Sequence, residues 1–253
     1  MSATTLRELH HGRKPGDPLV LPGPWDAASA RVFADAGFPA LATPSAGVAA
    51  SLGYEDGQTP ADEMFAAITR IVRAVDVPVS ADVEAGYGLS ARELVGRLAE
   101  AGAVGCNLED TDHATGTLRD PQEQADWLAQ VRAEAGDALV INARIDTYLR
   151  GVPDADETIR RGRLYAEAGA DCVYPFAAPP AQLARLATAI GLPVNAVVMP
   201  DGPAPRELGA LGAARVTFGP GLQWRAMAAV REMAEELRAE TTGRARTDRT
   251  DRT

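Results

Sequence analysis

The sequence predicts an α/β protein in which eight parallel strands, each followed by a helix, close into a single-domain (β/α)8 TIM barrel. Two observations indicate this fold. Short strand-like runs alternate with helical patterns along most of the 253 residues. The joints also repeat: a helix ends at Ala-Gly or Leu-Gly and a strand follows at once, because Gly supplies the left-handed turn that ends a helix. Chains of this length commonly form such a barrel as one domain.

The joints place the elements in chain order. Asp26 is expected to cap the first helix of the barrel, and DAGFPALAT joins that helix to the second strand. VDVPVSAD and IGLPVNAV are joints of a second type, in which Pro opens the strand, while EAGAVGCNLE, EAGADCVYP and ALGAARVTF repeat the first type. The predicted strands are Leu19–Pro22, Ala40–Thr43, Pro78–Asp82, Val104–Glu109, Ala138–Asn142, Cys172–Pro175, Pro193–Val197 and Arg215–Phe218. Helices are predicted near 26–36, 61–75, 91–102, 121–135, 155–169, 180–190, 204–211 and 221–239.

The barrel domain is predicted to span residues 15–239. A polar N-terminal segment, 1–14, precedes it, and a polar, low-complexity tail, 240–253, is expected to be disordered. The alternative fold is a doubly wound open sheet. No G-x-G-x-x-G follows the first predicted strand, which weakens a dinucleotide-binding interpretation.

Composition and charge narrow the class of function. Hydrophobic residues make up 46% of the chain and charged residues 24%, as in globular proteins with a sizeable core. The formal net charge of −10 argues against a nucleic-acid or anionic-membrane partner. No apolar stretch approaches a membrane span, and the N-terminus lacks a secretory apolar region. Cys106 and Cys172 lie in apolar runs, as expected of buried reduced thiols in a cytoplasmic protein.

Polar side chains follow the predicted strands at their C-terminal ends, where barrels of this type carry their chemistry. The second strand runs into Thr43–Val48, the third ends in Asp82 and Glu84, and the fourth ends in Asn107–Asp110. The fifth strand runs into Asn142–Asp146, and the seventh carries Asn195. These strand ends predict an active site at one rim of the barrel. The alternative is a solvated face that collects acids by chance.

The residue types at this rim indicate a chemistry. Asp82, Glu84 and Glu109 are hard oxygen ligands that suit Mg²⁺ or Mn²⁺, which keep several waters and need few direct protein ligands. Arg144 offers a planar fork for a carboxylate or a phosphonate. Residues 45–48 form a small-residue loop whose backbone N–H groups could cradle a second anionic group. Such a site would hold a small dianionic acid and stabilise an enolate.

Four stretches carry a family resemblance: LPGPWDAASARVFADAGFPALATPSAGVAASLGYEDGQ, ADVEAGYG, AGAVGCNLED and VINARIDTYLRG. Through them the chain resembles the isocitrate lyase/phosphoenolpyruvate mutase superfamily over about residues 15–238. The resemblance implies a Mg²⁺-dependent barrel that cleaves or forms C–C or P–C bonds through α-keto-acid enolates. It also implies a homotetramer in which neighbouring subunits exchange the last helix.

The resemblance also implies roles for individual residues. Asp82 matches the direct metal ligand, and Glu84 stands where the family usually has an Asp that reaches the metal through water. Glu109 matches the metal-shell glutamate of the fourth strand, and Asp56 matches an aspartate near the metal waters. Arg144 matches the arginine that binds the anionic end of the substrate. The loop expected to bind the substrate carboxylate consists of Ser45, Ala46, Gly47 and Val48.

The segment after the fourth strand departs from the family pattern. Isocitrate and methylisocitrate lyases carry Lys-(Lys/Arg)-Cys-Gly-His there, with the Cys as catalytic acid/base, whereas residues 111–119 read TDHATGTLR. Cys106 is no substitute, because it lies within the strand before Glu109. The lysine- and asparagine-containing loop of phosphonopyruvate-forming mutases is not matched either. The sequence therefore predicts a binding site under a short lid without the known catalytic motifs.

Three candidate site residues each have two possible interpretations. His113 in the lid could be a general acid or base, or a solvated loop histidine. Tyr54 could donate a proton or pack at the rim. Asn195 could hydrogen-bond substrate or satisfy the backbone at a strand end. With Asp56 and Arg144, Tyr54 and His113 make up the predicted catalytic set.

Three functions remain open at this point. The first is a Mg²⁺-dependent lyase that acts on a small α-keto acid or a 2-hydroxy di- or tricarboxylate through an enolate, including by decarboxylation. The second is a phosphonomutase or phosphonopyruvate hydrolase, which the lysine-free lid disfavours. The third is a barrel that binds a keto acid without catalysis. The expected partners are a small anionic substrate and further copies of the chain.

Overall fold

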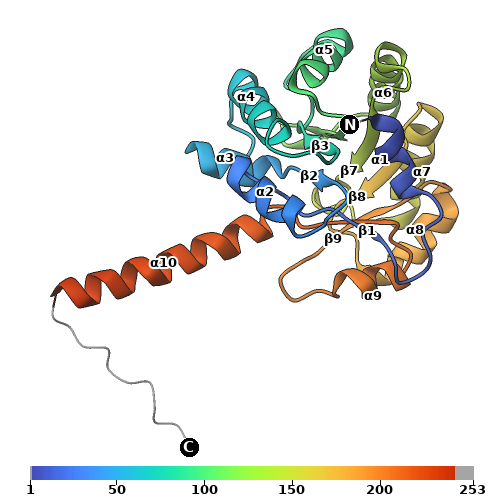
Figure 1. Cartoon of the computed structure of the whole chain (residues 1–253). Helices are drawn as coiled ribbons and strands as arrows, with labels where there is room; N and C mark the ends of the chain where they lie inside the picture. The colour runs from blue at the N-terminus through green and yellow to red at the C-terminus, as the bar shows by residue number, and fades with distance from the viewer. Residues whose placement is uncertain (1, 243–253) are drawn as a thin grey trace, which may run out of the picture.

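The computed structural model describes residues 2–242 and confirms a barrel of parallel strands (Figure 1). Five strands form one sheet in the order β2-β3-β4-β7-β8, and three form a second in the order β1-β10-β9. A bridge between Val173 and Val194 links β8 to the start of β9, and the N–H of Ala42 donates to the carbonyl of Pro22 at 3.2 Å. Both joints between the sheets are therefore closed. The strands are β1 Leu19–Val20, β2 Leu41–Ala42, β3 Val79–Asp82, β4 Gly105–Glu109, β7 Val140–Ile145, β8 Cys172–Pro175, β9 Asn195–Val197 and β10 Arg215–Thr217.

Helices surround the strands on the outside (Figure 1). Their ends follow local sequence signals. Asp26 caps α2 by accepting a hydrogen bond from the N–H of Ser29, as predicted, and Ser90 and Glu93 form a capping box at α5. Gly102 ends α5 in the left-handed conformation, with φ of 77°. The helices are α1 Ala3–His10, α2 Ala27–Asp35, α3 Ser45–Leu52, α4 Ala61–Val72, α5 Ala91–Ala101, α6 Pro121–Ala135, α7 Ala155–Glu167, η1 Pro180–Gln182, α8 Leu183–Ile190, α9 Pro205–Ala210 and α10 Gly221–Thr242.

Two hydrophobic clusters form the core, and neither covers the C-terminal end of the barrel. The larger lies between strands and helices and buries residues such as Ile68 and Leu98 completely or nearly so. The smaller gathers Leu6 of α1 with Leu19 and Val140, which stand at the starts of β1 and β7. Helix α1 therefore covers the N-terminal ends of the strands. The C-terminal ends remain open for a site.

Several segments differ from the sequence prediction. The polar segment 1–14 contains the helix α1, whose apolar residues recur at helical spacing. Residues 45–48, predicted as a loop, form the first turn of α3, whose sequence SAGVAASL includes three Ala and one Leu, which favour a helix. The lid contains a short hairpin, β5 Thr111–Asp112 and β6 Thr117–Leu118. The fifth barrel strand, β7, continues to Ile145 instead of ending at Asn142.

Helix α10 extends away from the barrel (Figure 1) and runs to Thr242, past the predicted helix end at residue 239. Residues 243–253 of the predicted tail lie outside the described residues. Within residues 2–242, no helix has both the length and the apolar character needed to cross a membrane. The side chains that α10 exposes include Trp224, Met227, Val230, Met233 and Leu237.

Candidate active site

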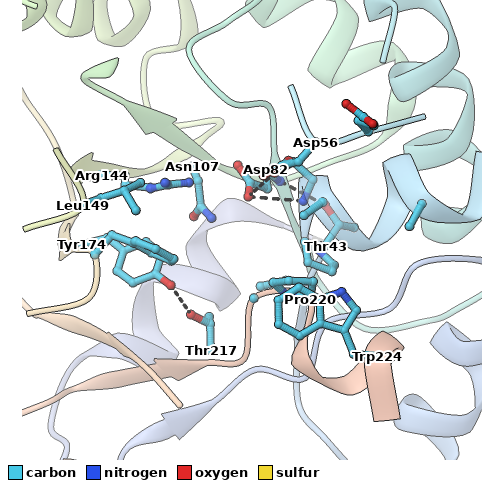
Figure 2. Close-up of a pocket in the computed structure, with 18 of the residues that line it drawn as sticks. Thr43, Asp56, Asp82, Asn107, Arg144, Leu149, Tyr174, Thr217, Pro220 and Trp224 are labelled. Carbon is cyan, nitrogen blue, oxygen red and sulfur yellow. Dashed lines mark hydrogen bonds between the residues drawn. The ribbon is translucent and has the colours of Figure 1, made fainter. Parts of the chain in front are cut away.

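A cavity of about 490 Å³ opens at the C-terminal ends of the strands, where the sequence predicts the site. Figure 2 shows Arg144, Asn107, Asp82 and Asp56 along one side of this cavity, with Tyr174, Thr217, Pro220 and Trp224 facing them from the other. The first side carries charge, and the second is largely aromatic and apolar. A cavity of this size suits a small organic acid.

Asp82, the last residue of β3, is held by the neighbouring strand end. Its Oδ2 accepts hydrogen bonds from the hydroxyl of Ser45 at 3.0 Å and from the backbone N–H of Ser45 at 3.3 Å. The N–H of Asp82 donates to Oγ1 of Thr43 at 3.0 Å. Since Ser45 begins α3, this N–H belongs to a helix N-terminus, a place that favours anions.

The chain leaves β3 through a turn of residues in the left-handed region. Glu84 and Tyr87 have φ of 52° and 56°, and Gly86 and Gly88 have φ of 86° and 69°. The left-handed conformation costs a residue other than glycine about 1–3 kcal/mol, and such residues cluster at functional sites. Gly86 is required for a second reason, because a Cβ there would lie 2.6 Å from the ring of Trp127. The turn places the Glu84 carboxylate beside Asp82.

Asp56, Asp82 and Glu84 form an acid cluster whose one ion-pair contact within residues 2–242 is the 3.8 Å approach of His113 Nδ1 to Oε2 of Glu84. Burial, followed by the charge of Asp82, raises the pKa of Glu84 to about 7. The same two causes raise the pKa of Asp56. Oε1 of Glu84 is buried and has no hydrogen-bond partner. A buried carboxylate with a free oxygen next to two like charges is the environment that a cation would stabilise.

The acid cluster fits a hydrated divalent cation such as Mg²⁺, because all its donors are carboxylate oxygens. Within residues 2–242, no three His, Cys, Asp or Glu side chains converge as direct ligands of one ion. The arrangement therefore fits an ion that keeps most of its waters. Asp82 would be the direct ligand, while Asp56 and Glu84 would hold waters.

Glu109, predicted for the metal shell, has partners on both oxygens. Its Oε2 lies 2.6 Å from Nη1 of Arg144, and its Oε1 lies 2.5 Å from Nε2 of His113. The hydrogen bond to Glu109 raises the pKa of His113. Nδ1 of His113 also lies 3.8 Å from Oε2 of Glu84. The lid histidine therefore lies between Glu109 and Glu84.

Arg144 is fixed from three sides. Beside the contact with Glu109, its Nε donates to Oδ1 of Asp146 at 2.7 Å, and its guanidinium lies 4.2 Å from the ring centre of Phe176. Burial opposes the charge, but Glu109 and Asp146 outweigh burial and raise the pKa of Arg144. Its Nε is engaged by the protein. Nη1 is engaged as well, by Glu109, so Nη2 is the nitrogen that remains for an anionic ligand.

We expect the metal-free protein to lose stability as the pH rises from about 5 to about 8. Glu84 has a pKa of about 7 in the fold against an ordinary 4.5, so the folded state binds its proton more tightly and loses this advantage as Glu84 ionises. The raised pKa of His113 acts with the same sign, because its favourable charge is lost at high pH. The pH dependence of the melting temperature, measured in a chelating buffer, tests this expectation. A melting temperature that rises over this range would contradict it, and Glu84→Gln should flatten the profile.

Some predicted residues line the cavity, and others lie behind it. The lining residues are Ser45, Ala46, Tyr54, Asp56, Asp82 and Arg144. Tyr54 directs its hydroxyl to Oε1 of Glu63 at 2.5 Å, on the exposed rim. Val48 is part of the hydrophobic core, and a Cβ at Gly47 would lie 2.9 Å from the ring of Pro44. Asn195 is fully buried and accepts a hydrogen bond from the Thr217 hydroxyl at 3.3 Å.

Several residues that complete the cavity were not predicted from the sequence. They are Thr43, Asn107, Tyr174, Phe176, Thr217 and Trp224. One signal could have found Asn107: alternate residues of a strand share a face, and Asn107 stands two positions before the inward-facing Glu109. The aromatic residues gave no such signal, since their partners come from distant parts of the chain.

Comparison with known proteins identifies the family to which the chain belongs. The family model described as phosphoenolpyruvate phosphomutase matches residues 6–238. The chain belongs to this family. An uncharacterised protein of Mycobacterium tuberculosis is 36% identical over 217 residues, which cover 85% of this chain and 81% of that protein. A 2-methylisocitrate lyase of Aeropyrum pernix is 33% identical over 182 residues, which cover 68% of this chain but only 57% of that enzyme.

Solved structures of the same fold agree. A candidate phosphonomutase from Burkholderia cenocepacia J2315 superposes with a TM-score of 0.85 at 40% identity, covering 92% of this chain and 97% of that one. An oxaloacetate acetylhydrolase, solved with the inhibitor 3,3-difluorooxalacetate, superposes with a TM-score of 0.83 at 26% identity, covering 93% and 86%. The predicted isocitrate lyase/phosphoenolpyruvate mutase superfamily is thereby confirmed, and the chain is an enzyme of a superfamily that includes lyases and mutases.

Proposed function

We propose that this enzyme is a Mg²⁺-dependent lyase that acts on a small α-keto acid, or a related 2-hydroxy acid, through an enolate. One observation carries the proposal: a single cavity is lined by a rigid guanidinium, Arg144, and by two members of the acid cluster, Asp56 and Asp82. A keto acid offers an anionic end to the first and a carbonyl oxygen to a cation on the second. The similarity to an oxaloacetate acetylhydrolase supports C–C bond chemistry on an oxaloacetate-like acid.

The chain's own residues would bind and orient the acid. A bound Mg²⁺ would supply positive charge for the carbonyl oxygen as the enolate develops. Ser45 holds Asp82 in place through its hydroxyl and its N–H, and the next N–H groups at the start of α3 would suit a carboxylate of the substrate. Arg144 would hold the other anionic end, and Phe176 and Trp224 would form the apolar side of the cavity against the substrate.

Turnover of a panel of α-keto and 2-hydroxy acids, with and without Mg²⁺, tests the proposal. We expect at least one oxaloacetate-like acid to be consumed at about 1 s⁻¹ or faster, and only with metal present. The similarity to a candidate phosphonomutase keeps P–C chemistry as a second candidate, which phosphorus NMR with phosphonopyruvate and phosphoenolpyruvate would reveal. Binding of keto acids without any turnover would indicate a non-catalytic barrel.

We expect no appreciable cleavage of isocitrate or 2-methylisocitrate. The lid hairpin offers no thiol, and its histidine, His113, is bound to Glu109. Cys106 and Cys172 are buried, and burial raises the pKa of each thiol to about 12, so neither is a ready proton carrier. Chemistry that protonates its enolate from water remains open. Glyoxylate or pyruvate release from these two substrates at about 1 s⁻¹ or more would contradict the expectation, and Tyr54 and His113 would then be mutated first.

Both cysteines are free thiols within the described part of the chain. A buried thiol needs no oxidising compartment, and free thiols persist where the surroundings are reducing. We therefore propose that the enzyme works in the cytoplasm.

We also propose that the enzyme is a homotetramer in which α10 packs on a neighbouring copy. The helix extends from the barrel and exposes apolar side chains at roughly helical spacing from Trp224 to Leu237. The double variant Met233→Glu/Leu237→Glu should therefore give a smaller species by light scattering, whereas Glu235→Lys on the same helix should not. A parent protein that is monomeric at micromolar concentration would contradict the proposal.

A further inference from the structure

Arg215 on β10 is a buried cation beneath the cavity. It is fully buried, and its Nε and Nη1 have no hydrogen-bond partner. Its Nη2 donates to Oγ of Ser80 and Oδ1 of Asn107, both at 3.3 Å, and within residues 2–242 no carboxylate forms an ion pair with it. A buried guanidinium without a counter-ion costs folding free energy. Its presence is therefore better explained by what it does to its neighbours than by stability.

Arg215 orients the side-chain amide of Asn107. Oδ1 of Asn107 accepts from Nη2 of Arg215 and, at 2.8 Å, from Nδ2 of Asn142. A guanidinium has five donors and no acceptor, so the Asn107 amide cannot turn its own donor toward Arg215. Arg215 therefore sets the orientation of this amide, and its NH₂ group must point elsewhere.

The free NH₂ group belongs to a residue that lines the cavity. Asn107 lies between Arg144 and Asp82 in Figure 2. It is the register partner of Asp82 where β4 pairs with β3. Within residues 2–242, Nδ2 of Asn107 donates to no protein acceptor. A fixed donor between the anion-binding arginine and the acid cluster stands where the reacting part of a bound keto acid would lie.

We propose that Asn107 is a further catalytic residue, whose Nδ2 donates a hydrogen bond to the substrate oxygen that becomes negative in the enolate, and that Arg215 is its positioning residue. The inference rests on the proposed function of the cavity. A donor that is already oriented stabilises developing charge without reorganising, which is how oxyanion-binding amides act. No covalent step is assigned to either residue.

The test compares four variants in turnover of the best keto acid of the panel and in calorimetric binding of oxalate, a dianion shaped like enolpyruvate, in the presence of Mg²⁺. Asn107→Leu keeps the volume and removes the donor, so kcat should fall by about 100-fold, with KM changed far less. Arg215→Met frees the amide and should lower kcat, whereas Arg215→Lys, which still donates to Oδ1, should restore part of it. Ser80→Ala removes the other acceptor of Arg215 and should leave activity unchanged.

The outcomes separate the two proposals. If the parent neither turns over any acid of the panel nor binds oxalate with Mg²⁺, the proposed function and this inference both fall. If the parent does so and Asn107→Leu keeps kcat and oxalate affinity within threefold, only the role of Asn107 is overturned. Should Arg215→Met not fold, the comparison of Arg215→Lys with Asn107→Leu still decides: an active Lys variant beside an impaired Leu variant supports the assignment, and equal impairment of both contradicts the positioning role.

Discussion

Asp82→Ala should abolish Mg²⁺ binding and lower kcat/KM by about 10³-fold or more, while the fold persists. Asp82 is the member of the acid cluster that sits at the strand end, is oriented by Ser45, and raises the pKa of both other members. Removing it takes away the direct ligand. It also relieves repulsion on Glu84 and Asp56, so the metal-free variant should unfold at a temperature no lower than the parent does.

Calorimetric titration with Mg²⁺ and thermal unfolding together check this result. Asp62→Ala is the matched control, because Asp62 is an exposed acid on α4 that pairs with Arg97 away from the cavity. The control should bind Mg²⁺ like the parent. Unchanged Mg²⁺ affinity in Asp82→Ala would remove the acid cluster as the metal site and, with it, the main support for enolate chemistry.

The barrel and its reactive rim could be predicted from the sequence because both depend on local signals. Gly after a helix and Pro before a strand mark the joints wherever they occur, and a polar residue at a strand end lies at the rim of any closed parallel barrel. Asp82 and Arg144 were assigned in this way, and both line the cavity. The start of α3 was missed because the small residues after Pro44 are equally typical of a loop.

The pairing of charges could not be predicted in the same way. Glu109 is predicted for the metal shell, and the structure gives both its oxygens protein partners, one from the next strand and one from the lid. Arg215 reaches Asn107 over a separation of 108 residues, which only closure of the barrel brings together. Sequence identifies which residues face inward, but the partner of each depends on register and curvature. The sequence therefore identifies the acids at the rim, but it does not show which of them have a cationic partner in the fold.

Arg144→Lys should lower kcat/KM by about 100-fold or more and leave Mg²⁺ affinity unchanged. The substitution keeps one positive charge but cannot reproduce the contacts of the guanidinium with Glu109, Asp146 and the face of Phe176. A lysine ammonium would be drawn to one carboxylate, so the nitrogen that Arg144 leaves for the substrate, Nη2, would have no counterpart. Oxalate should therefore bind more weakly, which distinguishes this variant from Asp82→Ala.

A second arginine whose guanidinium also contacts carboxylate oxygens provides the control for the loss of activity in Arg144→Lys. Arg160 contacts both oxygens of Glu157, at 2.7 and 2.8 Å, but does so on the exposed side of α7. Arg160→Lys should keep activity within about twofold, because exposed ion pairs contribute little. The contrast isolates what the cavity requires: a planar cation held in place by protein carboxylates, with one end left for the substrate. If Arg144→Lys turns over the keto acid as fast as Arg160→Lys, then Arg144 serves only to neutralise Glu109 and Asp146, and the anionic end of the substrate is bound elsewhere.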